Sequence, residues 1–141
     1  MAPNARAPMV VTHEGGLKFA AQVGSHRIIV DQPVRAGGED AGPAPIALLG
    51  VSLGTCVALY VQQFCSARNL PYEGMRVEVE SFGAQNPGRI GQFRVRVLLP
   101  QELPPKYAEM LEQVARSCPA HNTLAHGAEV NVEIAAPASV G

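Results

Sequence analysis

Short runs rich in β-branched residues occupy the beginning of the chain and predict β-strands. Glu14-Gly15-Gly16 and Gly24-Ser25 separate these runs, and both are typical of hairpin turns. The three runs are MVVTH, LKFAAQV and HRIIV, at residues 9–13, 17–23 and 26–30. We therefore expect three strands joined by two tight turns, followed by a loop rich in Gly and Pro.

The most apolar stretch, residues 46–68, predicts a long helix that follows a proline. Its most apolar part, Ile46–Val61, is shorter than the roughly 20 residues of a membrane span and includes Gly, Ser and Thr. We expect a core helix buried on most of its faces. Gly50 and Gly54 lie one turn apart, which favours close packing of another helix there.

The remaining pattern predicts three more strands and a second helix. Residues 75–82 and 93–99 alternate apolar and polar positions, which is typical of half-buried strands. A helix with one apolar face is expected over 106–118, after two prolines. Residues 128–136 alternate again and predict a final strand.

The resulting order, β-β-β-α-β-β-α-β, predicts an α+β fold with a long buried central helix. A chain of 141 residues can bury one core, and we expect a single domain over 1–141 with loose tails at 1–8 and 137–141. A six-stranded sheet would cover one face of the central helix. A second copy is the simplest cover for the other face, so we expect an obligate homodimer.

Charge and cysteine content narrow the possible partners and location. The formal net charge is −1 and the basic residues are scattered, so no binding of nucleic acid or of an anionic membrane is expected. The start, MAPNARAPMV, lacks the apolar core of a signal peptide. Three cysteines are too few, and odd in number, for a secreted disulfide framework. We expect a cytoplasmic protein.

The three cysteines differ in their predicted surroundings. Cys56 and Cys65 are nine residues apart on one helix, or about 180° in rotation, so they cannot share a site and Cys65 is expected to be packing. Cys118 precedes Pro119 and can cap a short helix through 121–124, where N–H groups would lower a thiol pKa. An isolated thiol is only roughly 3% ionised at pH 7, so Cys56 would need a nearby cation or donor. Chemistry alone leaves open which thiol attacks.

Two segments carry a resemblance to a known family. They read GGEDAGPAPIALLGVSLGTC and SCPAHNTL, and HRIIVDQP precedes the first. Gly42-Pro43-x-Pro45, Cys56 and Cys118-Pro119 are their most specific parts. The chain resembles the OsmC/Ohr superfamily, the osmotically inducible and organic hydroperoxide resistance proteins, from residue 9 to about residue 135. The resemblance implies an intertwined homodimer with long central helices packed under sheets from both chains.

The same resemblance implies a thiol-dependent peroxidase with its site at the dimer interface. Cys56 would attack the hydroperoxide and become a sulfenic acid, and Cys118 would resolve it as a disulfide. An external dithiol, for which a lipoyl-type group is a candidate, would reduce that disulfide by exchange. No cofactor and no metal are expected.

The activating residues of the family are not evident in this chain. The hairpin THEGGLKF lacks the family's arginine, and the helix start Pro45-Ile46-Ala47-Leu48 lacks its glutamate. We therefore expect a less active or differently tuned peroxidase. Other residues could supply positive charge or hydrogen bonds, or orient a group that does. These candidates are Arg27, Arg35, His26 and His121, with Glu39 and Asp40 as orienting carboxylates.

Two other functions are compatible with the same residues. Cys118-x-x-His121 with Cys56 and His126 could bind zinc, although one CxxH is a weak signal. A non-enzymatic protein on the same scaffold could instead sense oxidants or bind a small lipophilic molecule, and the missing Arg and Glu favour this second alternative.

Overall fold

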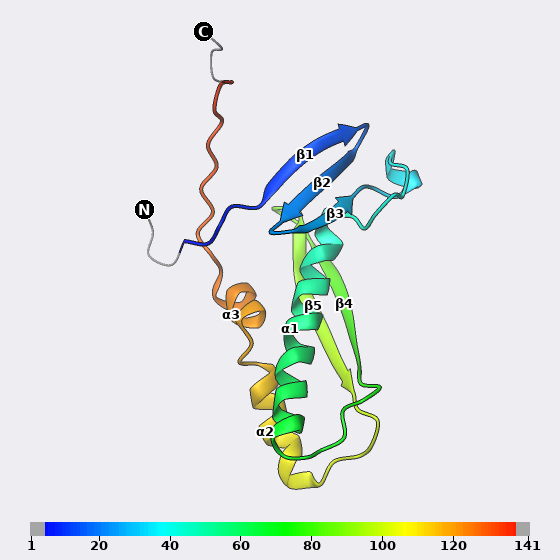
Figure 1. Ribbon diagram of the computed structural model, residues 1–141, viewed down its shortest axis with the longest axis vertical. Helices are drawn as coiled ribbons and strands as arrows, with labels where there is room; N and C mark the ends of the chain where they lie inside the picture. Colours follow the sequence, from blue (N-terminus) through cyan, green and yellow to red (C-terminus); the bar gives the residue numbers. More distant parts are fainter. Residues whose placement is uncertain (1–4, 138–141) are drawn as a thin grey trace. The chain divides into compact units, whose positions relative to one another are not determined.

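The computed structural model describes residues 5–137, which form five strands, three α-helices and one short 3-10 helix (Figure 1). The expected tails at 1–8 and 137–141 fall mostly outside these residues; within them, residues 5–8 and 137 have no regular structure. Two compact units divide the chain. One comprises Met1–Thr55 with Val77–Arg96, and the other comprises Cys56–Arg76 with Val97–Gly141. The expectation of a single domain stays a prediction.

The N-terminal strands form the predicted hairpins. Their order in the antiparallel sheet is β1-β2-β3. Phe19 on the central strand lies opposite His13 of one neighbour and Val30 of the other. The strands are β1 (Val10–Gly15), β2 (Lys18–Val23) and β3 (His26–Val30). The Gly-containing turns set this register, as the sequence predicts.

Asp31 organises the loop between β3 and the central helix. Its side chain is only 1% exposed. The carboxylate accepts hydrogen bonds from the backbone N–H groups of Gln32 at 2.7 Å, Glu39 at 3.2 Å and Ala41 at 3.1 Å. A Cβ on Gly42 would lie 2.1 Å from the carbonyl oxygen of Ile29, so this loop passes too close to β3 for any side chain. The hydrogen bonds of Asp31 and the close approach of Gly42 to β3 therefore fix the course of this loop between β3 and the central helix.

We expect Asp31→Asn to lower the thermal midpoint by several degrees at pH 7, because the amide cannot accept at both positions. Burial raises the pKa of Asp31, but the hydrogen bonds from Gln32, Ala41 and Glu39, with the charge of Lys18, hold it below the ordinary 3.8. A carboxylate with a lowered folded pKa stabilises the fold above the unfolded value, and this stabilisation is lost as the pH falls through the folded value.

The difference between wild type and Asp31→Asn should therefore shrink below pH 3.8. Thermal denaturation followed by circular dichroism between neutral and acid pH measures it. Asp40→Asn is the matched control, because Asp40 is an exposed acid of the same loop with a positive φ of 55° that Asn tolerates. Equal effects of the two substitutions would contradict this role for Asp31.

The predicted central helix is α1 (Pro45–Ala67), 23 residues long. Only part of its surface is buried within the chain. The buried residues share one side of the helix and are Leu53, Val57, Val61, Phe64 and Cys65. Large apolar side chains elsewhere on α1 are about half exposed, and they are Ile46, Leu49, Val51 and Leu59. The expected burial on most faces is therefore not achieved by one copy of the chain.

By length and composition α1 could also cross a bilayer, with a mean hydropathy of 1.6 in its most apolar window. It is the one such helix in residues 5–137. The core helix of a globular protein has the same character, so this property alone is weak evidence for a membrane span.

The glycines of α1 contact a strand, which corrects the expectation of a helix. A Cβ on Gly54 would lie 2.8 Å from Cγ2 of Val79 on β4 (Arg76–Ala84). Gly50 also lies near Val79 and near Phe93 on β5 (Arg89–Leu98). β4 and β5 form a separate two-stranded sheet. Small residues on a helix admit any close neighbour, and here that neighbour is a β-branched side chain.

The C-terminal part contains two helices but not the predicted last strand. α2 (Pro105–Ala115) packs on α1 through Phe64 and Tyr107, whose ring centroids are 6.1 Å apart in an edge arrangement. α3 (Pro119–His126) follows, and residues 127–137 form no strand. Val130, Val132 and Ile134 are 79%, 81% and 91% exposed. The expected six-stranded sheet is therefore wrong for a single copy, because the described residues contain two sheets of three and two strands.

Candidate active site

Cys118 is the N-cap of α3, as its place before Pro119 predicts. Its backbone is extended, with φ −69° and ψ 147°, and its Sγ accepts a hydrogen bond from the backbone N–H of His121 at 3.3 Å. The carbonyl oxygen of Cys118 accepts from the backbone N–H of Asn122 at 3.0 Å. Pro119 has no N–H to satisfy, so it suits the first helical position. The thiol is fully buried and held at the helix start.

Cys56 lies on α1, and its side chain is near enough to that of Cys118 to act on the pKa of the Cys118 thiol. The two thiols therefore come together within one unit of one chain, from positions 62 residues apart in sequence (118 − 56). Both are free cysteines, and Cys56 is half-buried whereas Cys118 is not exposed at all. Cys56 is consequently the thiol that a solvent-borne molecule can reach.

The pKa of Cys118 is raised above the ordinary thiol value of 9.0. Burial is the largest cause, and the hydrogen bond to Cys56 and the charge on that group raise it further. Hydrogen bonds from the backbone N–H groups of His121 and Ala120 act in the opposite direction. Burial outweighs the N–H groups of the helix start, so the lowered thiol pKa expected from the sequence at this position is wrong for Cys118.

Cys65 is separate from this pair, as predicted from its rotation on the helix. It is fully buried, and burial raises its pKa while the charge of Arg68 lowers it. Arg68 itself donates to the carbonyl oxygen of Phe64 at 3.1 Å and lies over that ring. A buried thiol with a raised pKa is a poor nucleophile, which fits a packing role.

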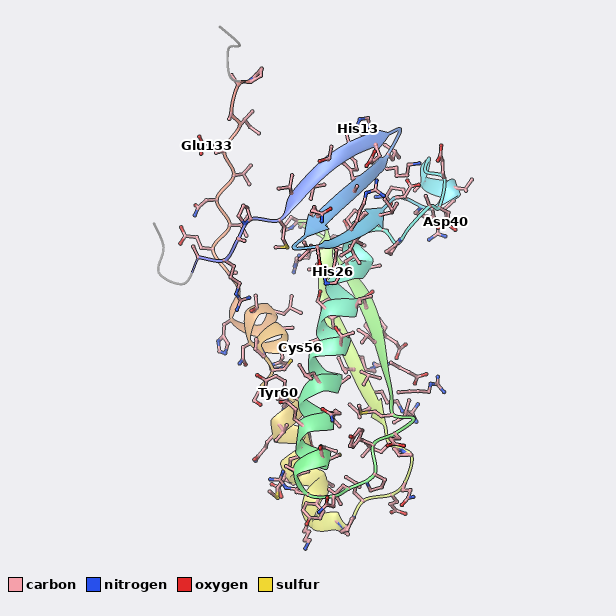
Figure 2. The ribbon with its side chains drawn as sticks, in the orientation of Figure 1. His13, His26, Asp40, Cys56, Tyr60 and Glu133 are labelled. Atoms are coloured by element: carbon pink, nitrogen blue, oxygen red, sulfur yellow. The ribbon has the colours of Figure 1, made fainter. Side chains whose placement is uncertain are left out.

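Most candidate helper residues lie in the unit that does not contain the thiols. Arg27 pairs with Glu14, and Glu39 pairs with Lys18 at 3.5 Å. His26 begins β3, and both Arg35 of the short helix η1 (Val34–Ala36) and Asp40 are exposed on the following loop. Figure 2 labels His26 and Asp40 in this unit. Only His121 belongs to the same unit as Cys56 and Cys118.

His121, in the first turn of α3 after Cys118, has an unsatisfied buried side-chain atom. Its Nδ1 is buried and has no hydrogen-bond partner, which no other buried side-chain nitrogen or oxygen in residues 5–137 shares. Its backbone N–H is the group that donates to Cys118. Buried polar atoms are normally paired, so an unpaired imidazole nitrogen is a candidate partner for a bound molecule.

Sequence reasoning missed two residues, one beside Cys56 on α1 and one in the loop of the other unit. Tyr60 lies one turn beyond Cys56 on the same face of α1, and Figure 2 labels both. The spacing of four residues could have indicated it. Asp31 was not predicted, although an aspartate at a strand end before a Gly-rich loop is a recognised turn signal.

The alternative zinc site would need at least three ligands around one point. Among residues 5–137, no group of three His, Cys, Asp or Glu side chains is placed to hold a metal ion. Cys56 and Cys118 are together, but His121 and His126 do not complete a ligand set with them.

An α+β chain with two neighbouring thiols, one on its long central helix and one capping a short helix, has the features of a cysteine-pair protein. A family model described as "OsmC-like protein" matches residues 37–133. This chain therefore belongs to the OsmC-like protein family. A search of curated proteins finds no match.

Solved structures share the fold. A Psychrobacter arcticus protein named for osmotic stress induction and a detoxification response is 24% identical, with a TM-score of 0.78 over 87% of this chain and 91% of that one. An OsmC-like protein from Mycoplasma pneumoniae is 20% identical, with a TM-score of 0.64 over 86% and 89%. An organic hydroperoxide resistance protein from Legionella pneumophila is 19% identical, with a TM-score of 0.57 over 86% and 91%. At these identities the similarity establishes the OsmC-like α+β fold.

Proposed function

We propose that this chain is a thiol-dependent peroxidase that reduces organic hydroperoxides through Cys56 and Cys118. The observation that carries the proposal is the proximity of a half-buried thiol, Cys56, to a fully buried thiol, Cys118. Membership of a family that includes organic hydroperoxide resistance proteins supports it. Cys56 is the attacking thiol because it is the accessible one.

The proposed chemistry has three balanced steps. The Cys56 thiolate attacks the distal peroxide oxygen, the O–O bond breaks, and the alkoxide takes a proton to leave as an alcohol. Cys118 then attacks the resulting sulfenic acid, so that an S–S bond forms and water leaves with the Cys118 proton. An external dithiol, such as a lipoyl-type group, reduces the disulfide by exchange and is itself oxidised to a disulfide.

The assembly expected for this activity is a homodimer. The exposed apolar side chains of α1 and of segment 128–134 are the support for it, because a monomer would leave them in water. We also propose a cytoplasmic location, where a dithiol can keep both cysteines reduced. No cofactor, metal, nucleic acid or membrane has a part in this proposal.

A thiol count tests the function directly. Reduced protein is mixed with one equivalent of cumene hydroperoxide, and free thiols are titrated over time. We expect two of the three thiols of each chain to disappear within seconds, with Cys65 remaining, because only Cys56 and Cys118 are paired. Peptide mapping should then find a Cys56–Cys118 disulfide.

A non-enzymatic sensor or small-lipophile binder is the second candidate function. The observation that favours it is that Arg27, the arginine of the N-terminal hairpins, is paired with Glu14. Thiol loss over hours, or none, after the same peroxide addition would support this candidate and contradict the peroxidase. A panel comparing hydrogen peroxide with bulky organic hydroperoxides would then identify the preferred oxidant.

A further inference from the structure

The two sulfurs that the proposed disulfide would join differ in their access to solvent. Cys118 is fully buried, at 0% exposure, whereas Cys56 is half-buried on α1. In thiol–disulfide exchange a thiolate must reach one sulfur and expel the other, so access decides which of the two sulfurs is attacked. A reductant that arrives from solvent can reach the sulfur of Cys56 and not that of Cys118.

The start of α3 shields Cys118 further. Its Sγ accepts a hydrogen bond from the backbone N–H of His121 at 3.3 Å, so the backbone of α3 lies directly against this sulfur. The side-chain amide of Asn122 donates to the carbonyl oxygen of Ser117 at 3.2 Å, and its backbone N–H donates to that of Cys118 at 3.0 Å. These bonds hold the capped turn together. An attack on Cys118 would require this turn to open, whereas an attack on Cys56 would not.

The same turn suits Cys118 as the leaving group. When a thiolate attacks Cys56, the S–S bond breaks and its electron pair goes to the sulfur of Cys118. The backbone N–H of His121 is already placed to donate to that sulfur, and a hydrogen bond to a charged acceptor is stronger than one to a neutral acceptor. Burial opposes a lasting charge there, so the released sulfur ends as a thiol.

We propose that the reducing dithiol attacks the Cys56 sulfur of the Cys56–Cys118 disulfide, so that Cys56 carries the reductant and Cys118 is released first. The proposal rests on the proposed function, because it assigns the sulfur at which that disulfide is reduced. The first thiolate of the dithiol forms an S–S bond to Cys56. Its second thiolate then attacks the reductant's own sulfur in this mixed disulfide, which closes the oxidised reductant and expels Cys56. The two protons of the dithiol pass through solvent to the two cysteines.

The test uses a monothiol, which cannot close a disulfide of its own and so leaves the mixed disulfide in place. The disulfide is formed in the full chain with diamide, without any peroxide, and the protein then receives a short pulse of 2-mercaptoethanol. N-ethylmaleimide in mildly acid buffer stops the exchange and blocks the freed thiol, and peptide mapping locates both groups. At the earliest times we expect mercaptoethanol on Cys56 and maleimide on Cys118, in at least roughly tenfold excess over the reverse arrangement.

Cys65→Ala is the matched control, because it removes the third thiol, which could otherwise exchange with the disulfide. Its native chain should show the same preference for Cys56. In urea both sulfurs are accessible, and the excess should fall to within about threefold.

Mercaptoethanol on Cys118, or on both cysteines in similar amounts, in the native chain would overturn the proposal. An excess on Cys56 that persists in urea would also overturn it, because the fold would then not be the cause. An excess on Cys56 confined to the native chain, in a protein that consumes no hydroperoxide, would uphold the proposal and overturn the peroxidase function alone.

Discussion

Replacement of Cys56 with serine is expected to abolish hydroperoxide consumption, lowering the rate by at least roughly a thousandfold. A serine hydroxyl is not ionised near neutral pH and cannot form a sulfenic acid, so both the attack and the resolving disulfide are lost. The measurement is the loss of cumene hydroperoxide in the presence of a dithiol, at equal concentrations of folded protein. A lipoyl-type dithiol should sustain many turnovers in the wild type.

Cys65→Ala is the matched control for this loss. Cys65 lies on the same helix but is fully buried and outside the pair, so its removal should leave the peroxidase rate within about twofold while slightly lowering stability. Peroxide consumption that survives in Cys56→Ser would show that a different group attacks. A rate lost equally in Cys65→Ala would show that the pair was assigned to the wrong cysteines.

Replacement of Val132 with glutamate is expected to weaken the homodimer by at least roughly thirtyfold in its dissociation constant. Val132 is 81% exposed in one chain and stands in a segment that alternates apolar and polar residues without a partner strand. Its burial against a second copy would stabilise the assembly, and a charge there would have to be desolvated. Sedimentation velocity over a concentration series measures the change.

Asn131→Glu supplies the control, because Asn131 is the neighbouring position on the other side of an extended segment. It adds the same charge and should leave the dimer nearly unchanged. A wild-type chain that sediments as a well-folded monomer at micromolar concentration would contradict the dimer. Equal weakening by both substitutions would mean that the alternation has no part in assembly.

The two predicted effects depend on different parts of the chain, so they separate function from assembly. The Cys56–Cys118 contact lies within one unit of a single chain, which makes the disulfide step possible before any partner is considered. A Val132→Glu monomer that still forms the disulfide would place the chemistry within one chain. One that no longer reacts would mean that the second copy completes the site for substrate.

Local patterns in the sequence were sufficient for most of the secondary structure. Turn glycines predict the three N-terminal strands, a long apolar run predicts α1, and a proline predicts the cap at Cys118. Each of these signals acts on residues close to it in the sequence. The final strand predicted over 128–136 did not form in the described residues. Alternation of apolar and polar residues indicates only that a segment can pair with another strand, and it does not supply that strand. The glycines of α1 likewise indicated a close neighbour without saying that it would be Val79 of a strand.

For the candidate site, the sequence by itself determined which thiols are available. Cys56 lies within a long helix and Cys118 lies before a proline, while Cys65 faces the opposite side of the helix from Cys56. Rotation along a helix and capping by a residue before proline are short-range properties, so they can be worked out from residue order. Only the tertiary structure decided that Cys56 and Cys118 lie close together, that Cys118 is the buried partner, and that most proposed helper residues belong to the other unit. Burial and contact between distant residues depend on how whole elements pack, and no local pattern carries that information.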